Sequence, residues 1–135
     1  MSHKLFIAYC LLFLIWSIPA FSEPVPVFIT NYDVTLTVDK NQPMHIQNNS
    51  IKVRSGNTIP YVELGRYKVE LRLSEQSPNR FSVDAAIFEK EKHDLRQISF
   101  DMPTYESELG IPLQFSWNSG DVLLDVALVV SIVSP

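Results

Sequence analysis

Residues 121–135, "DVLLDVALVVSIVSP", form the most apolar stretch of the chain outside its N-terminus. Within this stretch every second side chain is apolar, six times in succession. These positions are Val122, Leu124, Val126, Leu128, Val130 and Ile132. A period of two is typical of a β-strand, because successive side chains of a strand point to opposite faces of its sheet. Asp125 and the shortness of the run argue against a membrane-spanning helix, so we predict the main core strand of a β-domain here.

The opposite face of this predicted strand is also partly apolar. Its apolar members are Leu123, Ala127, Val129 and Val133. A strand that is apolar on both faces is either covered on both sides or half-exposed at a contact with a partner. We therefore name Leu123, Val129 and Val133 as possible partner contacts. Tyr105 joins them, because it lies in an expected polar crossover and aromatic side chains are favoured at interfaces.

The same alternation extends through most of the chain after residue 22. In residues 66–73, "RYKVELRL", the apolar side chains take one parity and the charged side chains take the other. One buried face and one solvated face are typical of an antiparallel sheet. Further strands are expected at residues 28–38, 81–89, 97–102 and 111–117. Polar or charged loops are expected at residues 42–49, which contain His45, and at residues 74–80, 89–94 and 103–110.

About eight short strands in one small domain must bury their apolar faces against each other. They can do so by packing two sheets face to face or by closing one sheet into a barrel. We predict an all-β fold, an antiparallel β-sandwich of about eight short strands, with a small closed β-barrel as the alternative.

Four isolated glycines suggest that the domain consists of two related four-strand halves. Alternating apolar residues follow Gly65 and Gly120 in the same way, and each of these glycines is preceded by another, Gly56 or Gly110. The two spacings are nine and ten residues. We expect two equivalent hairpins that differ by one residue in a turn or bulge.

The N-terminus has the features of a cleavable secretory signal peptide. Lys4 precedes an apolar run over residues 5–18, and Pro19, Ala20 and Ser22 resemble a cleavage region. We expect residues 1–22 to be removed, leaving a single all-β domain over residues 23–135. The predicted location is the periplasm or the extracellular medium, without a stable membrane anchor after removal of the signal.

The net charge of the predicted domain argues against some classes of partner, and its lack of cysteine bears on its compartment. The chain has 11 basic and 15 acidic side chains, and only Lys4 lies within the predicted signal, so the remaining domain would have a net charge of −5. This balance, without a basic run, argues against nucleic acid as a partner. The only cysteine, Cys10, lies within the predicted signal. A disulfide-free exported domain suits a bacterial periplasm better than an animal extracellular space.

No catalytic, cofactor or metal motif stands out. His93 has acidic neighbours in residues 89–94, but side chains on a short turn diverge into solvent, so no metal site is predicted. A glycoside hydrolase would need two converging carboxylates. The candidates are Asp33, Glu63, Glu70, Asp84, Asp101, Glu106 and Glu108, and those on strands occupy the solvated parity. We predict no enzyme and no cofactor.

The leading functional hypothesis is an exported, non-catalytic β-domain that binds protein. It would be an accessory, inhibitor or assembly factor of the bacterial cell envelope, and its partner would be an envelope protein or a second copy. Edge strands of such a fold can accept a strand from another chain. The alternative is a small carrier of an apolar ligand, which requires a cavity, and a hydrolase is third.

Overall fold

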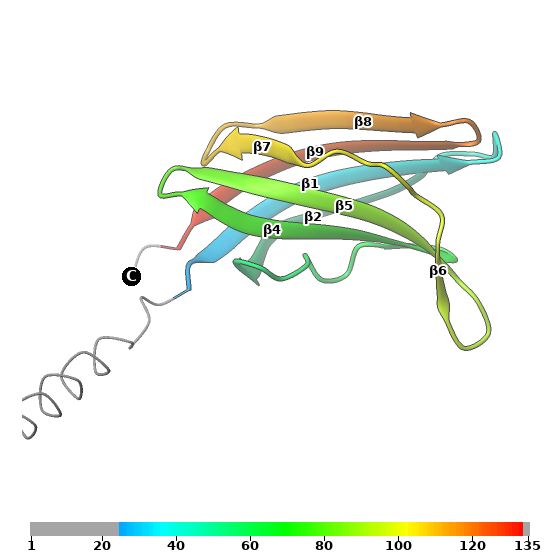
Figure 1. Cartoon of the computed structure of the whole chain (residues 1–135), viewed down its shortest axis with the longest axis horizontal. Helices are drawn as coiled ribbons and strands as arrows, with labels where there is room; N and C mark the ends of the chain where they lie inside the picture. The colour runs from blue at the N-terminus through cyan, green and yellow to red at the C-terminus, as the bar shows by residue number, and fades with distance from the viewer. Residues whose placement is uncertain (1–24, 134–135) are drawn as a thin grey trace, which may run out of the picture.

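The computed structural model describes residues 25–133, which form nine strands in two packed antiparallel sheets (Figure 1). The predicted signal peptide, residues 1–22, lies outside the described residues. The strands are β1 (Val27–Val38), β2 (Met44–Arg54), β3 (Glu63–Leu64), β4 (Tyr67–Ser77), β5 (Arg80–Lys90), β6 (Leu95–Gln97), β7 (Tyr105–Glu108), β8 (Leu113–Ser119) and β9 (Val122–Ile132).

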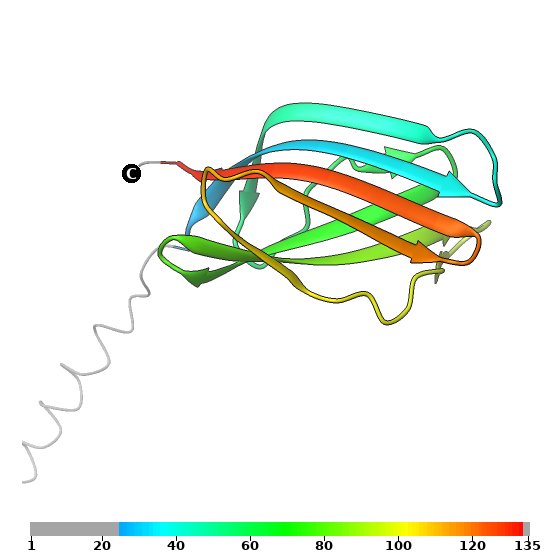
Figure 2. The same cartoon turned by 90° about the horizontal axis from the view of Figure 1, so that it is seen from above.

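The first sheet has the strand order β2-β1-β9-β8, and the second has the order β3-β4-β5-β6 with β7 also paired to β5. The two layers lie one above the other in Figure 1, and Figure 2 shows β8 and β2 at opposite margins of the first sheet. The predicted sandwich is confirmed, and the alternative of a closed barrel is wrong. Several strands are longer than we predicted, since β1 has 12 residues and β9 has 11.

The core between the sheets follows the predicted parity of β9. Leu124, Val126, Leu128 and Val130 are at most 3% exposed. The largest fully buried side chains opposite and beside them include Tyr32, Phe28, Phe81, Leu36, Leu71 and Leu73. No buried side-chain oxygen or nitrogen within residues 25–133 lacks a hydrogen-bond partner. The buried side chains are apolar except for Thr30, Ser82 and Ser99, so apolar burial is the main favourable contribution to the stability of the core.

The strand order repeats about a pseudo-two-fold relation. The order of one sheet becomes that of the other when equivalent strands are exchanged. The equivalent strands are β1 and β5, β3 and β8, and β4 and β9, and β2 corresponds to β6 and β7, which both pair with β5. The turns agree in detail. Leu64 lies opposite Tyr67 across Gly65, and Ser119 lies opposite Val122 across Gly120. This arrangement is the one expected for two related halves whose hairpins exchange between the sheets; the duplication itself stays a prediction.

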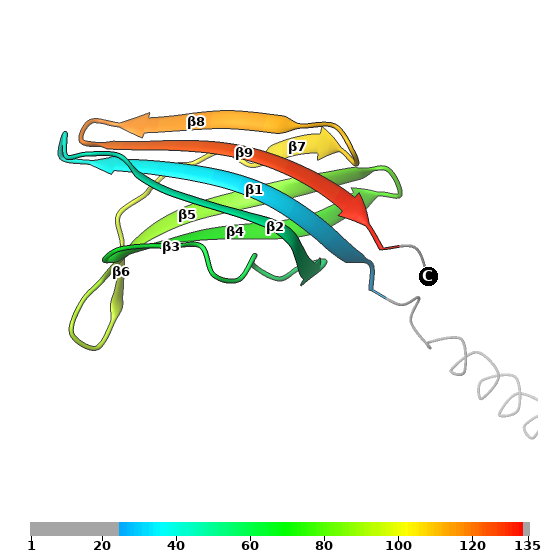
Figure 3. The ribbon, with the colours of Figure 1, turned by 180° about the vertical axis from the view of Figure 1, so that it is seen from behind.

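Four local predictions were wrong. The loop expected at residues 74–80 is only a two-residue turn, because β4 ends at Ser77 and β5 begins at Arg80. Residues 42–49 are not a loop, because β2 begins at Met44 and includes His45; its pattern was hidden by the irregular pairing near Ser50. The expected polar crossover contains β7, which starts at Tyr105. Residues 98–102 lie outside the strands, so Phe100 is 66% exposed although its parity suggested a core position. Figure 3 shows the β5–β6 hairpin projecting from the body of the sandwich.

Candidate functional site

The outer faces of β4 and β9 differ in chemistry, although the two strands occupy equivalent places. The outward side chains of β4 include Lys68, Glu70 and Arg72, and Lys68 approaches Glu70 to 3.6 Å. The outward side chains at the equivalent positions of β9 are Leu123, Asp125 and Ala127, all partly buried. The second sheet therefore presents a charged outer face, whereas the first sheet presents a mixed and largely uncharged one.

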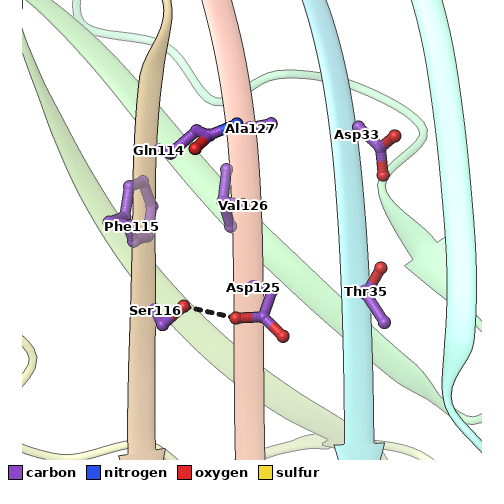
Figure 4. A pocket seen from close by; sticks show the side chains of 8 residues that line it. All are labelled: Asp33, Thr35, Gln114, Phe115, Ser116, Asp125, Val126 and Ala127. Atoms are coloured by element: carbon purple, nitrogen blue, oxygen red, sulfur yellow. Dashed lines mark hydrogen bonds between the residues drawn. The ribbon is translucent and has the colours of Figure 1, made fainter.

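A shallow depression of about 410 Å³ lies on this outer face of the first sheet (Figure 4). Its lining comes from β1, β9 and β8. These residues are Asp33, Thr35, Gln114, Phe115, Ser116, Asp125, Val126 and Ala127. The register explains their proximity, because Gln47, Asp33, Ala127 and Gln114 lie opposite one another in one row across the four strands. The small side chain of Ala127 leaves the floor of the row open.

The polar groups of the depression are partnered within the chain. The Ser116 hydroxyl donates a hydrogen bond to Asp125, as Figure 4 shows, and a carboxylate oxygen of Asp33 lies 2.5 Å from Nε2 of His45 on β2. Within residues 25–133, no group of three or more His, Cys, Asp or Glu side chains could hold a metal ion. Two partly buried carboxylates that each have their own partner do not form a nucleophile–base arrangement.

The edge strand β8 adjoins this depression and has no charged side chain. From Ile111 to Gly120 the sequence is "IPLQFSWNSG". β8 is paired with β9 alone, along all seven of its residues. Ile111, two residues before the first residue of β8, is 49% exposed. A regular, uncharged edge offers backbone N–H and C=O groups to another strand, a feature that monomeric proteins usually avoid.

The other edges of residues 25–133 have the protective features that β8 lacks. β2 carries Lys52 and Arg54, and its register with β1 shifts near Ser50, whose φ is +59°. β3 has only two residues, and the preceding segment contains Tyr61 at φ +68°. β6 and β7 are three and four residues long and carry charges such as Arg96. Charges, bulges and short strands all oppose edge-to-edge pairing.

Tyr105 lies beside this edge but not in the exposed position that we expected. It belongs to β7 and packs against the core, and its ring stacks on Phe115 of β8 with the centroids 3.8 Å apart. Burial raises the pKa of the Tyr105 hydroxyl, because the phenolate loses hydration. The stack joins the two sheets on the side of the sandwich where β8 has no neighbour.

The other predicted contacts lie along β9 rather than in one cluster. Leu123 is near the β8–β9 turn, whereas Val133 follows the far end of β9, where its N–H donates to the carbonyl of Val27 at 3.0 Å. Ten residues of strand separate them, which corresponds to about 33 Å. Val129 lies between them and lines a smaller depression with Pro112. No third layer covers the outer face of β9 within the described part of the chain.

The edge position of β8 was not predicted from the sequence, although the absence of charge in this strand is visible there. Residues 111–120 contain no Asp, Glu, Lys or Arg, but residues 41–51 and 126–135 contain none either, in a chain of which 19% is charged. Parity placed Phe115 and Trp117 in the core but could not show that β8 is an edge. Only the strand order reveals that.

Comparisons with protein-family models, curated proteins and solved structures found no match to this chain. Among residues 25–133 the search for membrane-spanning helices found none of sufficient length and hydropathy.

Proposed function

We propose that this chain is an exported, non-catalytic β-domain that binds an extended segment of protein at the edge of β8. The observation that supports this most directly is the contrast among the sheet edges. β8 is regular and uncharged over its whole length, whereas every other edge of residues 25–133 is short, irregular or charged. In this proposal the domain acts in the cell envelope, after removal of the signal peptide, as an accessory or assembly factor.

Binding at such an edge adds a strand to the first sheet. Main-chain hydrogen bonds to β8 would supply affinity, and alternate side chains of the added strand would supply specificity. Its inward side chains would lie beside Phe115 and Trp117, so apolar residues are favoured there. Its outward side chains would lie beside Gln114, Ser116 and Asn118, so neutral polar residues are favoured. The segment that fits is therefore an alternating strand with little charge.

The alternatives have less support. A carrier of an apolar ligand needs a cavity between the sheets, yet that space is occupied by Phe28, Tyr32 and Phe81, each at most 2% exposed. A hydrolase needs converging catalytic groups, whereas the two carboxylates of the outer depression are each hydrogen-bonded to a separate partner. Neither is proposed here.

A lysine placed on the edge tests the proposal. Gln114→Lys adds a charge to β8 in the manner of naturally protected edge strands, at an exposed side chain outside the core. Gln47→Lys is the matched control, because Gln47 lies in the same row on β2 and its side chain is also exposed. The measurement is mild crosslinking in an envelope extract of the natural host, followed by quantification of the captured proteins.

We expect the wild type and Gln47→Lys to capture the same partner, either an envelope protein or a second copy of the chain, and Gln114→Lys to lose most of it. Both substitutions should leave the free energy of unfolding within about 0.5 kcal/mol of wild type, because both sites are on the surface. Capture that is equal for all three proteins would reject β8 as the binding edge. If the wild type captures no protein and does not associate with itself, the proposed function as a whole fails.

A further inference from the structure

The β8 strand is complementary to itself in antiparallel pairing. Its seven residues, Leu113–Ser119, have Ser116 at their midpoint. A two-fold axis through this point would place Ser116 opposite Ser116 of a second copy, Gln114 opposite Asn118, and Phe115 opposite Trp117 of that copy. Amide then meets amide and aromatic ring meets aromatic ring, both of which are favourable cross-strand pairs. No like charges face each other along the ladder.

The register centred on Ser116 is preferred over its neighbours for a physical reason. Paired residues of a ladder lie on the same face, so the register can change only in steps that keep inward residues opposite inward residues. A centre at Phe115 would place Pro112, which has no N–H, opposite Asn118, and would place Ser119 opposite Ile111, outside β8. The Ser116 centre uses all seven residues of β8 and keeps Pro112 outside.

Pairing of β8 with β8 also closes the assembly. The result would be one continuous sheet with the strand order β2-β1-β9-β8 followed by the same four strands in reverse. Both ends of this sheet would be β2 edges, which Lys52, Arg54 and the irregularity at Ser50 protect. An isologous contact of this kind gives a closed dimer rather than a filament. The one unprotected edge of residues 25–133 is then paired, and the dimer has no other unprotected edge.

The charges around the β8 edge allow two copies of the chain to approach each other there. Each chain has a formal net charge of −4, or −5 without residues 1–22, so two copies repel one another in general. β8 itself is neutral. On the adjacent edge of the second sheet, Glu106 and Glu108 lie 3.9 and 3.5 Å from the guanidinium of Arg80. Their charge toward a second copy is therefore partly compensated.

We propose that the protein segment bound by β8 is β8 of a second copy, in an antiparallel two-fold dimer centred on Ser116. This inference rests on the proposed function, since it names the partner of the same edge. It predicts a continuous sheet across the dimer and a pair of aromatic contacts between Phe115 and Trp117 of the two copies.

Charge substitutions at the two paired amides test both the dimer and its register. The double variant Gln114→Lys with Asn118→Lys creates two lysine–lysine pairs across the interface. The double variant Gln114→Lys with Asn118→Glu instead creates two lysine–glutamate pairs at the same positions. The dissociation constant of each protein is measured by sedimentation equilibrium after expression of the full chain, with Gln47→Lys as the control on the opposite edge.

We expect the wild type and Gln47→Lys to dimerise with equal dissociation constants. The two-lysine variant should dissociate about tenfold more readily, because like charges directly opposite destabilise a strand pair. The lysine–glutamate variant should recover the affinity to within about threefold of wild type. Emission from Trp117, the only tryptophan after residue 22, should shift to the blue as the concentration of the wild type rises through the transition.

A register-specific crosslink provides the second measurement. Ser116→Cys places two thiols opposite each other at the two-fold axis, within reach of a disulfide. Asn118→Cys separates the two thiols by about four residues of strand, roughly 13 Å, which is beyond that reach. Oxidation should therefore give a covalent dimer with Ser116→Cys and not with Asn118→Cys.

Three results would overturn the inference. A wild type that stays monomeric up to about 1 mM has no such dimer. A dimer that is equally stable in the two-lysine variant uses another surface. Crosslinking of Asn118→Cys but not of Ser116→Cys contradicts the register. A monomeric wild type whose capture of an envelope protein is still abolished by Gln114→Lys would leave the proposed function standing and remove only the self-pairing.

Discussion

β4 and β9 are equivalent strands of this sandwich, and the difference between them locates the candidate site. Each is the longer strand of a hairpin turned at a glycine with positive φ, +60° at Gly65 and +56° at Gly120. Each buries alternate apolar side chains. Beyond β4, however, the edge segment is irregular around Tyr61, whereas beyond β9 lies the regular strand β8. The two hairpins have equivalent places in the topology, but only one of them ends in a regular edge strand. The regular, uncharged edge of β8 is therefore a property of its own sequence rather than of the fold.

The largest expected effect concerns the core, to which both β4 and β9 contribute buried side chains. Leu128→Ala and Leu73→Ala remove side chains that are 1% and 0% exposed at equivalent positions. Each should lower the free energy of unfolding by about 2–5 kcal/mol, the range for a large-to-small change in a packed core. Urea denaturation followed by circular dichroism measures both. A loss of less than about 1 kcal/mol for either variant would show that the core is not equally packed around the two strands.

An intermediate effect is expected at the outer faces, where β4 and β9 differ. Val129→Asp changes a half-buried side chain on a face that no further layer covers. The domain should stay folded and lose about 1 kcal/mol of stability. Ser74→Asp, at the equivalent position of β4, is the control and should cost about 0.5 kcal/mol or less.

If the outer face of β9 contacts a partner, Val129→Asp also weakens association while Ser74→Asp does not. Sedimentation equilibrium and crosslinking of the two variants test this. A folded Val129→Asp protein with unchanged association would remove Val129 from the set of contacts and leave the β8 edge as the interface.

The smallest expected effect is a pH dependence on the β8 side. Burial raises the pKa of Tyr105 above the value of 10.0 that it has in the unfolded chain. The folded state then holds this proton more tightly than the unfolded state. The associated stability is fully present below pH 10 and is lost as the pH rises through the folded-state pKa.

Tyr105→Phe keeps the stack on Phe115 and removes the ionisable hydroxyl. Its free energy of unfolding should therefore fall less between pH 8 and pH 11 than that of the wild type. Tyr61→Phe, at a tyrosine that is 75% exposed, is the matched control and should follow the wild type. An alkaline loss that is the same in all three proteins would show that Tyr105 ionises without a penalty in the folded state.

The sequence alone determined the fold class and the inward faces of the main strands. Parity is a local property of a strand, so Leu124 to Val130 in β9 and Tyr67 to Leu73 in β4 could be assigned to the core without knowledge of their neighbours. The glycine spacing likewise predicted two equivalent hairpins. β2 was missed because the irregular pairing near Ser50 interrupts its period of two, and β7 was missed because it is only four residues long and polar on both faces.

Only the tertiary structure decided which strands are edges, and therefore where the candidate site lies. Strand order depends on which hydrogen-bonding partners the chain selects over long sequence separations, such as β1 with β9, and no local pattern specifies these pairings. The same limit applies to Tyr105, which looked exposed in the sequence and is held in a stack by Phe115 across the sandwich. The composition of residues 111–120 was visible from the start, but its meaning as an uncharged edge depends on the absence of a further strand beside β8 in the described structure.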